Sequence, residues 1–234
     1  MHTPTDLYSL SAKPSLDTLS LDLLRQYYDT YLSPYRYTFY LSNGQEVNLA
    51  FQKHHLCHLL GIETVAKSRF NSEQKLLQYK GKWGYKNIKK GKIDFTHLKG
   101  LSPKKFRSIK DKLIFFYLIP HMLESSQVII DYMPDPSTSN VQCELLIFEI
   151  MHGVTVHVGI ETQTDGSYFP RTFLVERNKG TRFIEKQANR IDVKKFVKTE
   201  ISTGVVLKRI ISSKYAQKPS NRYRLHRKRA RLSL

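Results

Sequence analysis

Cysteine is scarce in this chain of 234 residues, which contains only Cys57 and Cys143. Two cysteines cannot form the disulfide framework of a small secreted domain, so we expect a reducing, cytoplasmic environment. Long apolar runs are also missing, since the run LIFFYLIP at residues 113–120 is far too short to span a bilayer. The N-terminus is polar, contains acids and does not resemble a signal peptide. We therefore expect a soluble protein with no membrane partner.

The sequence motifs of several enzyme classes are missing as well. There is no P-loop, no other glycine-rich phosphate loop and no Cys-His-Asn nucleophile arrangement. The acids are scattered, which disfavours a magnesium-dependent nuclease because such a site needs clustered carboxylates. We expect no cofactor and no metal ion. Zinc is an alternative, because His54 and His58 flank Cys57, but only Cys143 could add a further cysteine ligand.

Positive charge is abundant and unevenly distributed. The net charge is +18, and residues 177–234 hold 18 Lys/Arg against 3 Asp/Glu, whereas residues 1–176 hold 20 against 17. A basic C-terminal region favours a nucleic-acid partner, and interleaved tyrosine and arginine suit phosphate contact and base stacking. A solubilising tail without specific function is the alternative. The candidate nucleic-acid-binding residues are Lys186, Arg190, Arg222, Tyr223, Arg224, Arg227, Lys228 and Arg229.

The first half of the chain shows a hairpin among helices. Residues 35–42 and 45–49 favour strands, and Asn43-Gly44 is expected to supply two residues of positive φ in a tight turn. A helix is predicted from about Phe51, with His55 and His58 on its apolar arc. Further helices are predicted over residues 16–32, 72–80 and 104–124, the last starting at Ser102-Pro103 and kinked or ended by Pro120.

The second half favours strands. Residues 128–133, 143–151, 154–161 and 168–175 alternate or run apolar between short turns, which predicts an antiparallel meander. Residues 191–198 fit a further strand or a short helix. Helices followed by strands predict an α+β fold, with an N-terminal hairpin and helices packed on a four-stranded antiparallel β-meander.

Several motifs together resemble a known family. They are Phe51 with the His-Leu-Leu-Gly of residues 58–61, the IFFYL of residues 114–118, the YFPRTFLVE of residues 168–176, and the Ile-x-Val-Lys-Lys at 191–195. In this order they look like the phage-associated members of the Barnase–EndoU–colicin–RelE superfamily of nucleases, over roughly residues 35–198. The resemblance implies metal-independent RNA cleavage. It also implies a domain division into an N-terminal helical arm (1–34), a nuclease domain (35–198) and a basic C-terminal extension (199–234).

RNA cleavage without a metal needs a base for the 2′-OH, an acid for the 5′-oxygen, and cations or donors for the phosphorane. Histidine suits the first two roles and arginine the third. The candidate catalytic residues are His55, His58, His157, Arg171 and Thr172. Alternation along the strand puts His157 on the face opposite Val156 and Val158, so it would meet His58 only if the helix reached the sheet edge. Each candidate also has an ordinary structural alternative, such as a core histidine bonded to a carbonyl.

We therefore expect an endoribonuclease toxin acting on tRNA or mRNA, from a phage or mobile-element system and held by an antitoxin or immunity protein. The alternative is a non-catalytic nucleic-acid-binding module on the same scaffold, with the tail supplying most of the affinity. A more distant alternative is an effector that modifies a protein.

Overall fold

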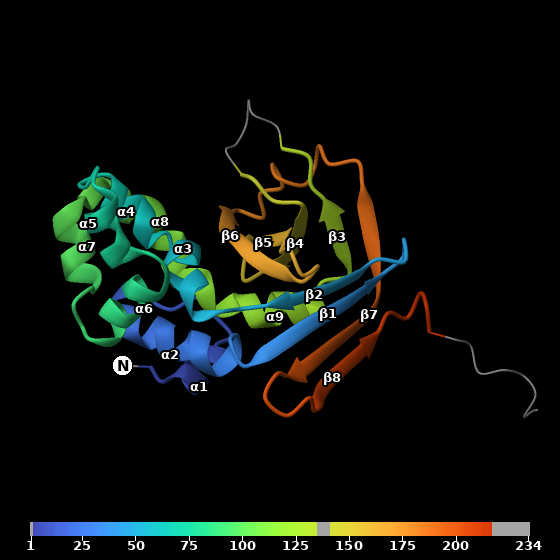
Figure 1. Cartoon of the computed structure of the whole chain (residues 1–234). Helices are drawn as coiled ribbons and strands as arrows, with labels where there is room; N and C mark the ends of the chain where they lie inside the picture. The colour runs from blue at the N-terminus through green and yellow to red at the C-terminus, as the bar shows by residue number, and fades with distance from the viewer. Residues whose placement is uncertain (1, 135–140, 217–234) are drawn as a thin grey trace, which may run out of the picture.

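Helices dominate the first half of the chain and strands the second (Figure 1). The computed structural model describes residues 2–134 and 141–216. The α-helices are α1 (Pro4–Tyr8), α2 (Leu21–Tyr31), α3 (Leu56–Leu59), α4 (Ile62–Lys67), α5 (Glu73–Leu76), α6 (Gly81–Lys89), α7 (Phe95–Leu101), α8 (Pro103–Phe115) and α9 (Ile119–Ser125). Short 3-10 helices are η1 (Leu16–Thr18), η2 (Lys53–His55), η3 (Leu77–Tyr79) and η4 (Phe116–Leu118). The strands are β1 (Tyr35–Leu41), β2 (Glu46–Ala50), β3 (Val128–Asp131), β4 (Leu145–Met151), β5 (Val154–Thr162), β6 (Tyr168–Arg177), β7 (Arg190–Glu200) and β8 (Val206–Ile211).

The predicted hairpin is confirmed as β1–β2, which pair antiparallel from Arg36↔Ala50 to Tyr40↔Glu46. Its turn differs in one detail from the prediction, because only Gly44 takes a positive φ, of +91°. Asn43 acts through its side chain, whose Oδ1 accepts the Gln45 N–H at 3.0 Å. An Asx-type bond of this kind stabilises a turn without requiring positive φ at the asparagine.

The predicted four-stranded meander is wrong as a description of the sheet. Strands β3 to β6 do pair in sequence, but the sheet continues in the order β1-β2-β6-β5-β4-β3-β7-β8, and β7 also pairs with β1. Seven strands therefore close a mixed barrel, and β8 adds to β7 outside the closure. Among the described strands every pair is antiparallel except β2–β6, which meet in parallel at Leu49↔Tyr168. Residues 191–198 belong to strand β7, not to a helix.

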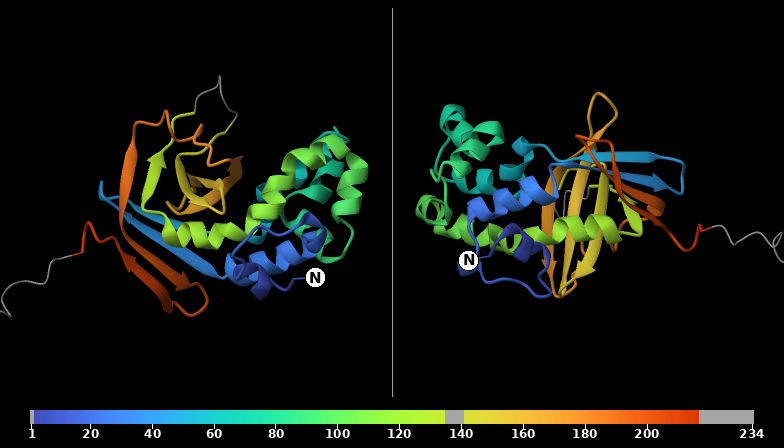
Figure 2. Two further views of the ribbon diagram at one scale, coloured as in Figure 1. Left: turned by 180° about the vertical axis from the view of Figure 1, so that it is seen from behind. Right: turned by 90° about the horizontal axis from the view of Figure 1, so that it is seen from below.

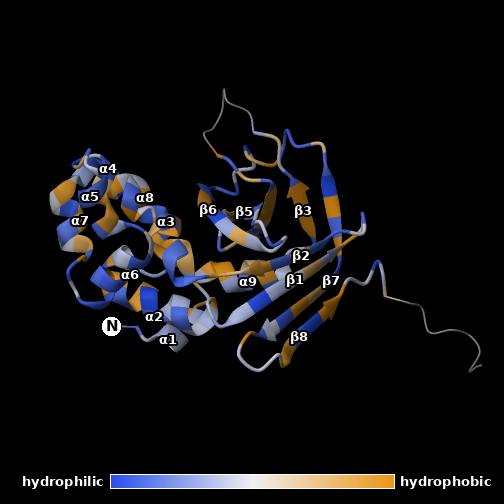
Figure 3. Cartoon of the chain, in the orientation of Figure 1, coloured by the Kyte–Doolittle hydropathy of each residue, from blue (hydrophilic) through white to orange (hydrophobic). Residues whose placement is uncertain are grey.

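The closed barrel has an apolar inner face. Alternate residues of each strand, such as Phe39, Val47, Val158 and Phe173, are fully buried in one core cluster. Helix α9 packs on β4 and β5 and contributes Met122 to this cluster. Figure 2 shows α9 running past the strands at one end of the barrel, with the other helices gathered to one side. Figure 3 shows that α9 and β3 are strongly apolar, as elements buried in a core must be.

Two of the predicted helices are divided in the structure. The expected helix over residues 16–32 divides into η1 and α2, because the Ser20 side chain caps α2 by accepting the Leu23 N–H at 3.0 Å. The expected long helix begins at Ser102-Pro103 but breaks at η4, and Pro120 lies in the first turn of α9. Throughout the described segments, no helix has the length and apolarity that a membrane crossing demands.

The three-part domain division stays a prediction. Residues of the expected N-terminal arm, including Leu7 and Tyr27, are fully buried in the core they share with the barrel. Strand β8 lies in the expected basic extension, and residues 217–234 fall outside the described residues.

Gly61 separates α3 from α4 and lies against α8. Its φ is +76°, and a Cβ built there would lie 2.7 Å from Ile109 Cγ2. The left-handed backbone turns the chain sharply, and the missing side chain lets it approach α8. The predicted single helix from Phe51 is therefore interrupted, and His58 leaves the apolar arc to face outward.

We expect Gly61→Ala to lower the free energy of unfolding more than Gly44→Ala does. Both substitutions place a side chain at positive φ, which costs about 1–2 kcal/mol. Only Gly61 also faces a close neighbour, which adds ~1–3 kcal/mol of overpacking. Urea denaturation of the two variants measures the difference, and equal losses would contradict the packing argument.

Candidate active site

A cleft of about 660 Å³ lies where η2, α3 and α4 approach α6 and β6. It contains three histidines, four cations and one carboxylate, together with an exposed tryptophan. Those residues are His54, His55, His58, Lys67, Lys80, Lys82, Arg171, Glu63 and Trp83. We call this site the histidine cleft. Its residues come from segments far apart in the sequence, since β6 follows η2 by more than a hundred residues.

His55 is held by the chain leaving β2. Its Nδ1 accepts the Gln52 N–H at 3.1 Å, and its ring stacks on Phe169 of β6 at 5.6 Å. Burial lowers the pKa of His55 to about 3, and the neighbouring His54 and His58 act in the same direction. His55 is therefore neutral near pH 7, and because Nδ1 accepts, the ring proton sits on Nε2. A neutral Nε2–H can donate a hydrogen bond but is not an effective proton donor in acid catalysis.

His58 has a contrasting environment. Its side chain is 46% exposed, and its Nδ1 lies 3.5 Å from Glu63 Oε2. A carboxylate on the Nδ1 side favours the tautomer with its proton there, which leaves the Nε2 lone pair available to take a proton. The break at Gly61 brings Glu63 back beside His58, since the two residues flank that turn.

The four cations of the cleft differ in how far they are neutralised. Lys80 pairs with Glu73 at 2.5 Å, and Arg171 lies 3.5 Å from Glu161. Lys67 and Lys82 have no carboxylate within ion-pair distance among the residues the structure describes. Lys82 also faces His54, whose pKa falls because of burial first and this positive charge second. The cleft therefore presents net positive charge suited to phosphate.

Trp83 stands at the edge of the cleft. It is the single tryptophan of the chain and is 57% exposed, with the Lys86 ammonium 5.2 Å from its ring centre. A large ring left in water beside a cationic cleft offers a flat surface on which a nucleobase can stack.

Comparison with protein families assigns the chain. A family model described as phage-Barnase-EndoU-ColicinE5/D-RelE like nuclease4 matches residues 24–233. The chain belongs to this family. Comparison with curated proteins and with solved structures gives no match. Membership of a nuclease family implies a nucleic-acid substrate, and the resemblance noted from the sequence motifs is confirmed.

In this nuclease, the structure brings together three of the five predicted catalytic residues. His55, His58 and Arg171 all line the histidine cleft. Thr172 does not line it; this residue is half-buried on the opposite side of β6, beside its register partner Gly159. The sequence left open whether the helix carrying His58 meets His157. In the structure His58 lies near Arg171 of β6, and His157 does not line the cleft.

His157 is fully buried on the outer face of the barrel. Its Nε2 lies 2.9 Å from Glu176 Oε1, although the contact lacks hydrogen-bond geometry, and the ring of Phe183 closes over it at 5.5 Å. Burial alone would raise the pKa of Glu176, but the contact with His157 and the backbone N–H of Arg182 outweigh it and lower that pKa. The predicted face is right, but the face is not open there, because residues 181–187 cover it.

The predicted nucleic-acid-binding residues fall into two groups. Lys186 and Arg190 are exposed, and an Arg190 Nη2–H donates to the Ile184 carbonyl at 3.2 Å. Arg222, Tyr223, Arg224, Arg227, Lys228 and Arg229 lie outside the described residues.

The zinc alternative has no geometric support in this nuclease. Cys57 is fully buried with its Sγ toward Gly84, and Cys143 lies in a separate cluster on the outer face of the barrel. Over residues 2–134 and 141–216, no three His, Cys, Asp or Glu side chains are grouped to hold a metal ion.

Sequence reasoning missed Glu63, Lys67, Lys82 and Trp83. The first two could be linked to His58 only through the turn at Gly61, which a continuous helix pattern hides. Trp83 carried a usable signal, because it lies in the basic run GKWGYK and an aromatic ring among cations suits base stacking.

We expect His55→Asn to make the fold less sensitive to mild acid. The pKa of His55 in the folded state lies below its usual value, so the unfolded chain takes up the proton first as pH falls below about 6.5. The contribution of neutral His55 to the free energy of unfolding is fully present above about pH 6.5 and is lost as the pH falls toward 3. About 2 kcal/mol of it is lost between pH 7 and pH 5. Asparagine keeps an acceptor near the Nδ1 position for the Gln52 N–H but does not titrate.

The measurement is the free energy of unfolding of both proteins at pH 7 and pH 5. From pH 7 to pH 5, the free energy of unfolding of the wild type should fall by about 2 kcal/mol more than that of the variant. Other titrating groups are common to both proteins and cancel. An unchanged difference would show that His55 is not held neutral.

Proposed function

We propose that this nuclease is a metal-independent endoribonuclease that works from the histidine cleft. The observation that carries the proposal is the pair His58–Glu63 inside a cationic cleft, which has the composition of an acid–base phosphodiesterase site. His58 is the general base that takes the 2′-OH proton on Nε2. Glu63 orients its ring and stabilises the positive charge that the ring gains.

The other cleft residues support charge development on the phosphorane. Neutral His55 donates from Nε2–H, and Arg171 with the unpaired Lys67 and Lys82 supplies positive charge. The 2′-oxygen forms a bond to phosphorus as the bond to the 5′-oxygen breaks, the departing oxygen takes a proton from the ammonium group of Lys67 or Lys82, and a cyclic 2′,3′-phosphate remains. The lysine ammonium groups are the cations available to that departing oxygen.

The substrate in this proposal is single-stranded RNA. Trp83 stacks a base next to the scissile phosphate, which requires that base to be free of a duplex. The family description is phage-associated, which supports a toxin role with an acidic antitoxin or immunity partner.

We expect purified protein to cut tRNA or mRNA in EDTA and to leave cyclic-phosphate ends. His58→Ala should lower the rate about 10²–10⁴-fold, because it removes the proposed base. Gel mapping of end-labelled RNA measures both rate and end chemistry. His97→Ala is the matched control, since His97 is an exposed histidine on α7 outside the cleft.

RNA that is bound but left intact would overturn the enzyme and support a non-catalytic binding module. Cleavage that needs added metal would overturn the mechanism while leaving a nuclease. Expression in a bacterial host provides a second readout, because growth arrest that persists in His58→Ala would contradict toxicity through this site.

We expect Trp83→Ala to raise KM for RNA about tenfold with little change in kcat, because base stacking contributes ~1–3 kcal/mol to binding. Trp83→Phe should retain most of the affinity, since it keeps an aromatic face. Steady-state kinetics on a short labelled oligonucleotide separate the two parameters. Equal behaviour of the Ala and Phe variants would rule out stacking.

A further inference from the structure

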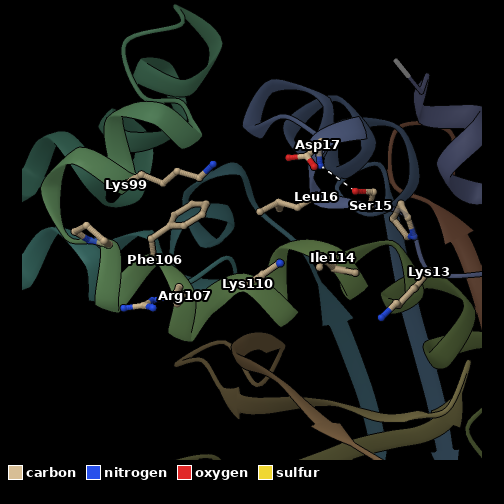
Figure 4. Close-up of a pocket in the computed structure, with 11 residues that line it drawn as sticks. Lys13, Ser15, Leu16, Asp17, Lys99, Phe106, Arg107, Lys110 and Ile114 are labelled. Carbon is tan, nitrogen blue, oxygen red and sulfur yellow. Dashed lines mark hydrogen bonds between the residues drawn. The ribbon is translucent and has the colours of Figure 1, made fainter.

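A second cavity, of about 840 Å³, lies away from the histidine cleft, between residues 13–17 and the helices α7 and α8. Figure 4 shows Lys99 and Phe106 on one side of it and Ser15, Leu16 and Asp17 on the other. Four cations line it: Lys13, Lys99, Arg107 and Lys110. Among the described residues, Asp17 is the single acid that lines it. We call this cavity the basic groove.

The groove is built by regular secondary structure. Pro103, Arg107, Lys110 and Ile114 follow one another at helical spacing of four, three and four residues, so they form a single stripe along α8. The opposite wall is the start of η1, where the Ser15 Oγ accepts the Asp17 N–H at 3.4 Å. Both walls are therefore fixed before any ligand arrives.

The four cations lack neutralising partners. Across the described parts of the chain, none of them lies within ion-pair distance of a carboxylate. Lys99 instead lies over the Phe106 ring at 5.5 Å. Like charges held together repel one another, and a ligand with several negative charges relieves that repulsion.

We propose that the basic groove binds the phosphate backbone of an RNA strand, as a second contact for the substrate of the histidine cleft. The inference rests on the proposed function for the identity of the polyanion. An acidic protein fits less well, because protein interfaces depend on apolar anchors entering pockets. The apolar floor here is already filled, with Phe106 3%, Ile114 7% and Leu16 9% exposed. Long, flexible cationic side chains over a filled floor suit phosphates.

The groove and the cleft lie on different sides of α8. The side chains of Ile109 and Lys112 face Gly61 at the α3–α4 turn, which positions the cleft, and the stripe of Arg107 and Lys110 points the other way around the helix. A short oligonucleotide can fill the cleft alone, whereas a longer or folded RNA can reach both sites. The groove thus selects substrates by size, without taking part in the chemistry.

Lysine footprinting tests the inference in the full chain. His58→Ala protein is acetylated with and without a saturating long single-stranded RNA, and the reactivity of each lysine is read by mass spectrometry. We expect RNA to protect Lys99 and Lys110 from most of their acetylation. Lys104 and Lys105 are the matched controls, because both are exposed near the start of α8 but do not line the groove. Unchanged reactivity at Lys99 and Lys110 would overturn the inference, as would equal protection by polyglutamate.

A variant separates the groove from the active site. Lys99→Ala/Lys110→Ala should flatten the slope of log Kd against log salt for long RNA by about 1.4, at ~0.7 per phosphate contact. Cleavage of a short oligonucleotide should not change. A slope equal to that of Lys104→Ala/Lys105→Ala would contradict the binding of RNA in the groove. If the wild-type protein cleaved no RNA, only the proposed function would be contradicted, because lysine footprinting and the salt dependence of Kd both measure binding.

Discussion

The pairing of β1 with β7 is the constraint on which the rest of the structure depends. It joins residues about 160 positions apart, from Tyr35↔Glu200 to Leu41↔Val193, and turns an open sheet into a barrel. Closure places the inner side chains of the hairpin in the common core and fixes the direction in which the chain leaves β2. That direction brings His55 against Phe169 of β6. The histidine cleft is thus a consequence of barrel closure, because neither η2 nor β6 contains the whole site.

Burial gives two histidines three positions apart opposite chemical properties. His55 sits under β6, bonded through Nδ1 and kept neutral, whereas His58 points outward with a carboxylate behind it. Residues three apart lie near one another on a helix, so spacing alone predicts that the two rings share an environment. In the structure, Phe169 of β6 covers the ring of His55, whereas Glu63, which follows the turn at Gly61, lies beside the exposed ring of His58. The contact with β6 and the turn at Gly61 therefore give the two rings different surroundings.

Local signals allowed much of the fold to be predicted, while the closure depended on contacts with no local signal. Asn43-Gly44 marks the hairpin, Ser102-Pro103 marks the start of α8, and turn residues separate β3 to β6. The parallel contact of β2 with β6 rests on the single register pair Leu49↔Tyr168, which no periodicity in either strand indicates. In the candidate site, His58 was predicted from its motif, whereas Glu63 comes beside it through the turn at Gly61 and Trp83 lines the same cleft through tertiary structure. His157 was assigned to the right face, and its cover by Phe183 could not be read from alternation.

Net charge along the sequence is a poor guide to where this nuclease is basic. Residues 1–176 carry a net charge of only +3, yet within the described part of the chain they supply every cation of both the cleft and the groove. The acids of this region are engaged elsewhere, as in Asp22 and Asp29 with Arg25, and Asp111 with Arg177. Pairing removes those carboxylates from the two cavities and leaves their lysines largely unopposed. Because a phosphate responds to charges within about one Debye length, roughly 8 Å at physiological salt, this local segregation governs binding more than the total does.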